Sequence, residues 1–310
     1  MPVYDYSYRT WQGERSGPML RWLAIPKYTF MQLLSKRMFL WIFTVAWFQF
    51  VLRAAYIYLL VNPEFLISLG LAGHLPQPTP ERSLQETLQQ VLPQVGPFFF
   101  KNMIDVQLIF CFLLAFVAGS DLISRDLAHR AFVLYASKPI SRWEYFLGKF
   151  LTLFVMMMAL TWFQAVVLYV LQTAVSPPRA PWRLHFWHDS AWIFVAITAY
   201  SAIVSATLSL LILAASSMVK NGRYAGMALV AYIIGASVVG GIMTGILRTT
   251  NALTMSPFLS VLDLGYRLFH LRHYGSGMSL TAAWIGVTTV CGVSGWILWL
   301  RLRGGARYGT

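Results

Sequence analysis

The sequence predicts an all-α polytopic membrane protein with six transmembrane helices and both termini on the same side. Of its 310 residues, 57% are hydrophobic and only 11% are charged, whereas soluble domains carry about 25% charged residues. Six long stretches are almost free of charge. Because a helix needs about 20 mostly apolar residues to cross the hydrocarbon layer, this pattern excludes an ordinary soluble protein. The 21 Phe, 15 Tyr and 12 Trp residues exclude a disordered chain.

Each stretch is long enough to cross the membrane once. The last contains no charged residue, while the second is the weakest because Lys101 and Asp105 lie near its start. The expected spans are 38–60, 98–119, 150–175, 190–219, 224–247 and 278–300.

The distribution of basic residues predicts the orientation, because cytoplasmic segments of membrane proteins are enriched in Lys and Arg. With the N-terminus in the cytoplasm, 16 of the 24 basic residues are cytoplasmic. The protein is thus expected in the cytoplasmic (inner) membrane, with both termini on its cytoplasmic side. The net charge of +13 therefore reflects topology, with attraction to anionic membrane lipids as a secondary effect. No soluble segment is long enough for a nucleic-acid-binding surface. The inner basic residues are Arg9, Arg15, Arg21, Lys27, Lys36, Arg37, Arg125, Arg130, Lys138, Arg142, Lys149, Lys220, Arg223, Arg301, Arg303 and Arg307.

The chain divides into a cytoplasmic N-terminal segment (1–37), a transmembrane domain (38–300) and a short cytoplasmic tail (301–310). Residues 1–37 are too long and too charged for a secretory signal, and their mixture of apolar and basic residues is typical of a segment that lies on the inner membrane surface. Cys111 and Cys291 both fall within spans, which indicates packing rather than a disulfide. The expected outer loops are 62–97, 176–189 and 248–277.

The sequence contains no catalytic motif that we recognise. It lacks the G-x-x-x-x-G-K-[ST] loop that holds nucleotide phosphates and the G-x-S-x-G and H-E-x-x-H hydrolase motifs. Two outer pairs, His185 with His188 and His270 with His273, have a spacing that could hold zinc or copper. Neighbouring aromatic residues fit an interfacial belt instead. We therefore expect no metal, no cofactor and no catalytic residue in this chain.

The loop 120–149 between the second and third spans is the most informative segment. Apolar residues recur there at helical spacing, and Pro139 is expected to end this helix. Ser141 and Glu144 then have the spacing of a capping box that begins the third span. The loop is thus predicted to form a helix, a sharp bend and a second helix that enters the membrane. Such a bend would transmit a displacement on the cytoplasmic side to the membrane helix.

The same loop resembles the ABC-2 type transporter permease family. The resemblance rests on Arg125-Asp126, followed by the run S-K-P-I-S-R at 137–142, Glu144, and Gly148-Lys149; Arg130-Ala131 departs from the Gly-Thr pair usual in that family. In the family, this region is a coupling helix that docks onto a separate ATPase. The alternative is that these charges are solvated and only obey the topology rule. The docking candidates are Asp126, Arg130, Lys138, Pro139, Ser141, Arg142 and Glu144.

The resemblance implies the permease subunit of an ATP-binding cassette transporter, exporter-like and paired with a second copy as a homodimer. ATP and Mg²⁺ would bind a partner ATPase, while the substrate cannot be read from the sequence. A second hypothesis is a membrane anchor or mechanical transmitter, driven by a partner ATPase to remodel a periplasmic or envelope protein. An ion-coupled secondary carrier is disfavoured because the spans hold few carboxylates.

Some membrane-embedded residues suggest specific contacts. Arg53 and Asp105 are expected at a similar depth, and because intramembrane charges normally pair, we expect an ion pair between the first two spans. This pair would be structural or would contact a polar substrate. Gly241 and Gly245 predict close helix packing, with a flexing gate as the alternative. Two outer segments, 62–97 and 256–273, are expected to contain amphipathic helices, the latter resembling a re-entrant helix of the same family.

Overall fold

The computed structural model describes residues 24–62, 95–128, 141–175, 190–271 and 275–304. These residues are almost entirely helical, and they include six helices that are long and apolar enough to cross a membrane. The predicted multi-span all-helical fold is therefore confirmed. The six spans are Arg37–Leu60, Pro97–Asp126, Trp143–Ala174, Ala191–Met218, Gly222–Leu247 and Leu280–Arg301.

Several spans are built from more than one helical element. The second and third spans each contain a five-residue π-helical segment, η3 and η4, between two α-helices. The elements in chain order are α1 (Ala24–Leu34), α2 (Arg37–Val61), α5 (Pro97–Leu114), η3 (Ala115–Gly119), α6 (Asp121–Ala128), α8 (Arg142–Met158), η4 (Ala159–Phe163), α9 (Gln164–Val175), α10 (Ala191–Met218), α11 (Gly222–Leu247), η5 (Thr250–Met255), α12 (Pro257–Leu268) and α13 (Leu280–Gly304).

The second and third spans are longer than the sequence predicts. The second continues through η3 into the charged helix α6. The wider π turn maintains the backbone hydrogen bonding across this junction, where the Ser120 N–H donates to the Ala115 carbonyl. The third starts at Arg142, directly after the predicted capping residue Ser141, although its apolar stretch begins only near residue 150. Hydropathy does not reveal either extension, since the added turns are amphipathic, but the capping box predicts where the third span starts.

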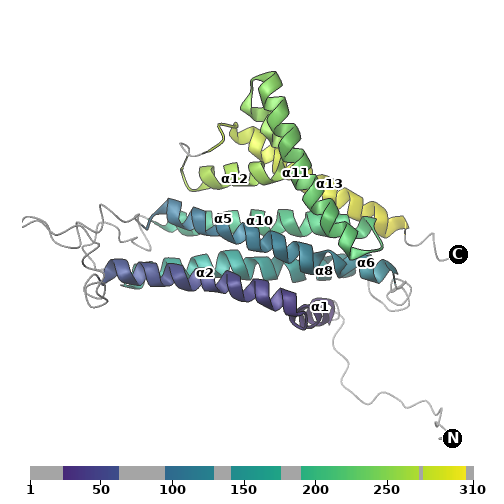
Figure 1. Cartoon of the computed structure of the whole chain (residues 1–310), viewed down its shortest axis with the longest axis horizontal. Helices are drawn as coiled ribbons and strands as arrows, with labels where there is room; N and C mark the ends of the chain where they lie inside the picture. Colours follow the sequence, from purple (N-terminus) through teal and green to yellow (C-terminus); the bar gives the residue numbers. More distant parts are fainter. Residues whose placement is uncertain (1–23, 63–94, 129–140, 176–189, 272–274, 305–310) are drawn as a thin grey trace, which may run out of the picture.

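Four long stretches, α2, α5, α8–α9 and α10, run roughly along one direction in the body of the molecule (Figure 1). Helix α10 is central and contacts α5, α6, α8, α11, α12 and α13. Helix α11 leaves this body at an angle, so that its far end stands away together with η5 (Figure 1). Helix α1 lies across the end of the body where α6 is found, and packs on α8.

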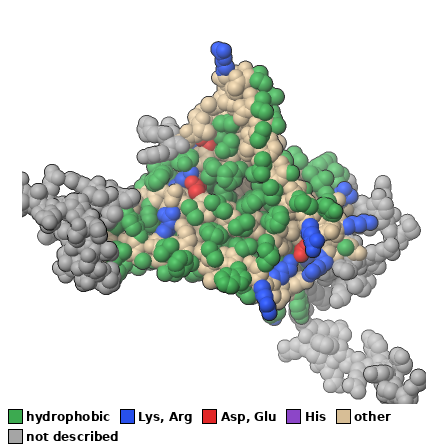
Figure 2. Space-filling view, in the orientation of Figure 1, with side chains coloured by type: hydrophobic (Ala, Val, Ile, Leu, Met, Phe, Trp, Pro, Cys, Tyr) green, Lys and Arg blue, Asp and Glu red, His purple; other side chains and the backbone are tan. Residues whose placement is uncertain are grey.

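The core lies between α5, α8–α9 and α10. Buried side chains there include Ile104, Leu153, Tyr169, Tyr200 and Ile212. Helices α2 and α11 are mostly exposed, and apolar side chains cover much of the visible face of the spans (Figure 2). Such a surface suits a hydrocarbon environment, in which exposed apolar side chains carry no cost.

The amphipathic helix expected within 256–273 is present as α12. Ser256 caps its N-terminus by accepting a hydrogen bond from the Leu259 N–H at 3.3 Å, and Pro257 occupies the first turn. Before it, η5 runs back along α11, with the Ser256 and Ser237 hydroxyls 2.7 Å apart. Helix α12 therefore starts beside the middle of α11 rather than at its end. The helix predicted within 62–97 lies outside the described residues.

Candidate functional site

The short helix α6 is anchored to α10 by a serine side chain. Ser216 accepts hydrogen bonds from the Ile123 and Ser124 N–H groups at 3.1 and 3.0 Å, and it donates to the Ser120 carbonyl at 2.8 Å. The first N–H groups of a helical turn need partners from outside the turn. Ser216 provides them, so the position of α6 depends on α10.

Two ion pairs attach α6 to other spans. Lys36, between α1 and α2, places its Nζ 2.8 Å from Asp121 Oδ2. Lys149 of α8 places its Nζ 3.1 Å from Asp126 Oδ2, and the Tyr145 hydroxyl donates to the same oxygen at 2.6 Å. We refer to Lys36, Asp121, Asp126, Tyr145 and Lys149 as the α6 clasp.

The two ion pairs of the clasp differ in burial. The side chains of Lys149 and Asp126 are 8% and 17% exposed, whereas those of Lys36 and Asp121 are 25% and 36% exposed. Removing one partner of a buried pair leaves an uncompensated charge, while an exposed pair contributes little to stability. The Asp126–Lys149 pair is therefore the stronger attachment.

Two glycines let neighbouring helices approach the clasp closely. A Cβ atom on Gly222, at the start of α11, would overlap the Asp121 carboxylate. A Cβ atom on Gly148 of α8 would lie 2.9 Å from Ile25 of α1. Larger residues at these positions would push α11 and α1 away from α6 and α8.

Four residues of the clasp, Lys36, Asp121, Asp126 and Lys149, line an open crevice between α1, α6 and α8. Basic side chains gather at this end of the molecule (Figure 2). Thr29 and Arg125 also line the crevice, and the Arg125 side chain is exposed. This end is the one that the sequence predicts to be cytoplasmic.

The predicted capping box at the start of α8 is confirmed. The Glu144 N–H donates to Ser141 Oγ at 3.2 Å, and the Ser141 N–H donates to Glu144 Oε2 at 2.6 Å. Both side chains therefore have a local role in starting the third span, as the spacing of the two residues indicates.

The other predicted docking residues are only partly described. Asp126 is held inside the chain by Lys149 and Tyr145. Arg142 begins α8, whereas Arg130, Lys138 and Pro139 lie outside the described residues. Of the clasp residues only Asp126 is among the predicted site residues; Lys36, Asp121, Tyr145 and Lys149 are not. The charge of Asp121 directly after an apolar span was the signal that could have drawn attention to this position.

The predicted Arg53–Asp105 ion pair is wrong. Asp105 pairs with Lys101 on its own helix and accepts a hydrogen bond from the Tyr200 hydroxyl at 2.6 Å. Arg53 instead donates to Asn102 Oδ1 at 2.7 Å and to the Phe99 carbonyl at 3.3 Å. The first two spans are joined, but through neutral acceptors, because the closer Lys101 already neutralises Asp105.

The predicted packing role of Gly241 and Gly245 is not seen within the chain. Both glycines are exposed, and a Cβ atom at either position would meet nothing within 4 Å. The neighbouring Gly240 is the one that packs, against the backbone of Ala252 and Leu253 in η5. The G-x-x-x-G spacing indicated that α11 packs closely, but it did not indicate which face of α11 is covered by η5.

Of the histidines proposed as weak metal candidates, only His270 is described. Its ring stacks on Trp192 with centroids 4.6 Å apart, and its backbone is left-handed at φ 58°. His185, His188 and His273 lie outside the described residues. Within the described part of the chain, no group of three or more His, Cys, Asp or Glu side chains could hold a metal ion.

Comparison with known proteins agrees with the motif in the loop 120–149. The family described as ABC-2 family transporter protein matches residues 30–268, which include five of the six spans and α12. None of the curated proteins matches the chain. Members of this family are membrane transport components rather than catalytic subunits. The chain is a multi-pass membrane protein that belongs to the ABC-2 family of transporter proteins.

Proposed function

We propose that this chain is the permease subunit of an ATP-binding cassette transporter in the cytoplasmic membrane, and that it exports a substrate using ATP hydrolysed by a separate subunit. ATP and Mg²⁺ bind that partner. Residues 129–141, which join α6 to α8 in sequence, are the core of the docking segment. Both termini lie on the cytoplasmic side with this segment.

The α6 clasp is the observation that supports this proposal best. The Asp126–Lys149 pair fastens together the two helices that flank the docking segment. Helix α6 also contacts α10 and α11, and its Asp121 pairs with Lys36 next to α2. A displacement of the segment by an ATPase would therefore reach several spans at once.

The decisive experiment is charge reversal in the docking segment, followed by affinity purification from native membranes. We expect an ATPase with a nucleotide-binding loop to co-purify with the wild-type protein. The purified complex should hydrolyse ATP. The triple variant Arg130→Glu, Lys138→Glu and Arg142→Glu should lose both. Arg248→Glu makes the same type of change just after α11, at the predicted outer side, and serves as the matched control. Undiminished retention in the triple variant would contradict the docking role.

We further propose that two copies of the permease assemble with two ATPase subunits. Helix α11 supports this pairing because Gly235, Gly241 and Gly245 have no atom within 4 Å of their Cβ positions. Glycines permit close contact between membrane helices. A second copy would cover the exposed glycine face of α11.

A further inference from the structure

Three glutamine side chains from three spans meet inside the helical body. Gln107 of α5 is fully buried, and its Nε2 lies 2.7 Å from Gln49 Oε1 of α2 and 2.6 Å from Gln164 Oε1 of α9. The same nitrogen lies 2.9 Å from the Ala46 carbonyl of α2. We refer to Gln49, Gln107 and Gln164 as the glutamine triad. One side chain of α5 thus connects α2 with α9.

The triad has more acceptors than its central donor can serve. The amide nitrogen of Gln107 carries two hydrogens, whereas three acceptors lie within hydrogen-bond distance, two on α2 and one on α9. A bond from Gln107 to Gln164 leaves one hydrogen for α2, and two bonds to α2 leave none for Gln164. Helices α2 and α9 therefore compete for the same donor.

Two polar atoms of the triad are buried without a hydrogen-bond partner among the described residues. They are Gln107 Oε1 and Gln164 Nε2. A buried polar group without a partner lowers stability, and the surrounding hydrocarbon layer supplies no water to compensate. The position of Gln164 in the triad gives one hydrogen bond but leaves its own amide hydrogens unused. Its net contribution to stability is therefore small, and a second position of this side chain is close in free energy.

The π-helical segment η4 provides the means to move Gln164, which follows it directly. A π turn contains one residue more than an α turn. If this extra residue shifted past Gln164, the side chain would turn by about 100° around the helix axis. The same segment touches α2, because the Phe163 ring lies 6.0 Å from the Trp47 ring. A change in η4 would therefore act on the triad and on α2 together.

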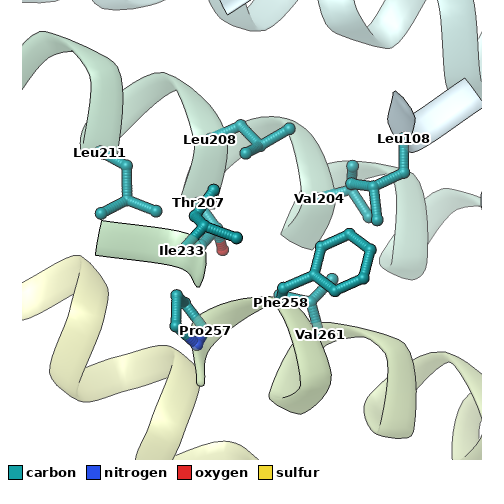
Figure 3. A pocket seen from close by; sticks show the side chains of 9 residues that line it. All are labelled: Leu108, Val204, Thr207, Leu208, Leu211, Ile233, Pro257, Phe258 and Val261. Carbon is teal, nitrogen blue, oxygen red and sulfur yellow. The ribbon is translucent and has the colours of Figure 1, made fainter. Parts of the chain in front are cut away.

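Helix α5 is held firmly on the side that faces away from the triad. Leu108, the residue after Gln107, lies with Val204 of α10 and Phe258 of α12 around a small apolar crevice (Figure 3). Helix α2, by contrast, is mostly exposed. Along α2 the triad lies between the contact of Arg53 with Asn102 and the Lys36–Asp121 ion pair. Gln107 thus determines how tightly the middle of α2 is held.

We infer that the glutamine triad is a conformational switch that sets the attachment of α2 to α5. With Gln164 in the triad, Gln107 gives one hydrogen to α9 and one to α2. With Gln164 turned away, Gln107 gives both hydrogens to α2 and holds it more tightly. The switch consists of residues of this chain alone, so it goes beyond the proposed function and does not depend on an ATPase.

Unfolding of the full-length protein in mixed micelles tests the competition. Gln49→Met removes one neutral hydrogen bond and should raise the equilibrium constant of unfolding about fivefold. Gln107→Met removes the shared donor and should raise this constant about 25-fold, the effect of two such bonds. Gln164→Met frees a hydrogen for α2 and removes an unpartnered amide, so it should leave the constant unchanged or lower it.

The matched control for unfolding is Thr161→Val in η4. Thr161 is fully buried like Gln164, but its hydroxyl donates to the Met157 carbonyl of its own helix at 2.9 Å. This substitution should leave the unfolding constant unchanged. Equal increases of the constant in Gln49→Met and Gln164→Met would overturn the competition between α2 and α9.

Spin labels measure the attachment of α2 directly. The labels replace Leu52 on α2 and Val195 on α10, which are 55% and 63% exposed, in protein whose native cysteines are changed to alanine. Pulsed electron paramagnetic resonance in lipid nanodiscs gives the distribution of distances between them. We expect two populations with the native triad. Gln49→Met should favour the longer distance about fivefold, and Gln164→Met should favour the shorter one by a similar factor.

These two substitutions are of the same type, so opposite shifts cannot both come from misfolding. Thr161→Val should leave the ratio of the two populations unchanged. A single population that neither substitution alters, or a shift in the same direction in both variants, would overturn the switch. If no ATPase co-purifies with the chain, the proposed function fails while the distance measurements still test the switch.

Discussion

Lys101 and Asp105 form an ion pair one helical turn apart inside the second span, with the Lys101 side chain almost fully buried. Arg53, although it lies close to the same helix, bonds to Asn102 and to the Phe99 carbonyl. The two basic residues near this part of α5 therefore have different environments. One neutralises a carboxylate, and the other connects two spans through neutral oxygens.

Double-mutant cycles should separate these two roles. Asp105→Ala leaves Lys101 buried without its partner and should lower the free energy of unfolding by about 3–5 kcal/mol. The Lys101→Met/Asp105→Ala double variant should recover part of that loss. The Arg53→Ala/Asp105→Ala pair should be closer to additive, because the two side chains share no direct contact. Unfolding of the wild-type protein, the three single variants and the two double variants in mixed micelles gives both coupling energies. A larger coupling of Asp105 with Arg53 than with Lys101 would contradict the structure.

The two ion pairs of the α6 clasp should differ in their effect on stability. Asp126→Asn removes the partner of the buried Lys149 and should cost about 3 kcal/mol. Lys36→Met, at the more exposed pair, should cost no more than about 1 kcal/mol. Thermal unfolding in detergent gives the comparison. Equal losses in the two variants would mean that the difference in burial has no energetic consequence.

Much of the fold follows from the sequence because lipid imposes a simple rule. Long uncharged stretches must become helices that satisfy their own backbone, and all six were placed within a few residues at most ends. The continuation of the second span into α6 was missed because its amphipathic turns resemble loop sequence, whereas the capping box indicated the start of α8. The angle of α11 could not be predicted either, since it depends on the contacts of α11 with η5 and α10.

Gly222 and Gly235 of α11 have different surroundings, so substituting them should have different effects. Gly222→Ala should displace the Asp121 carboxylate, because the added Cβ would overlap it. We therefore expect lower stability and a weaker response of the ATPase to the permease. Gly235→Ala on the same helix meets no atom within 4 Å and should be neutral or slightly stabilising in a single copy, since alanine favours helices by about 1 kcal/mol. Equal destabilisation by both substitutions would contradict the contact with Asp121.

The candidate site was only partly predictable for a related reason. The capping box depends on local spacing, so Ser141 and Glu144 could be identified from the sequence alone. The clasp joins residues 85 positions apart at Lys36 and Asp121, and no local pattern records such a distance. The Arg53–Asp105 prediction used depth alone, whereas the position of Lys101 one turn from Asp105 decided the pairing.

The capping box should stabilise the first turn of α8 by a measurable amount. Glu144→Ala removes the partner of the Ser141 N–H and should cost about 1 kcal/mol, whereas Glu144→Gln should retain much of the bond. Hydrogen exchange of the first turn of α8 should increase in the alanine variant only. If Glu144→Gln instead abolishes retention of the ATPase while exchange is unchanged, Glu144 acts in docking through its charge.

Cross-linking tests whether a second copy covers α11. Ile242 is 56% exposed and lies next to Gly241, so Ile242→Cys should form a disulfide-linked dimer in native membranes after both native cysteines are replaced. Val195 on α10 is 63% exposed but is not next to the glycine face, so Val195→Cys should remain monomeric under the same oxidation. The glycine face predicts this contrast because two helices approach closely only where both lack side chains. Cross-linking of Val195→Cys with Ile242→Cys unreactive would place the second copy on another helix.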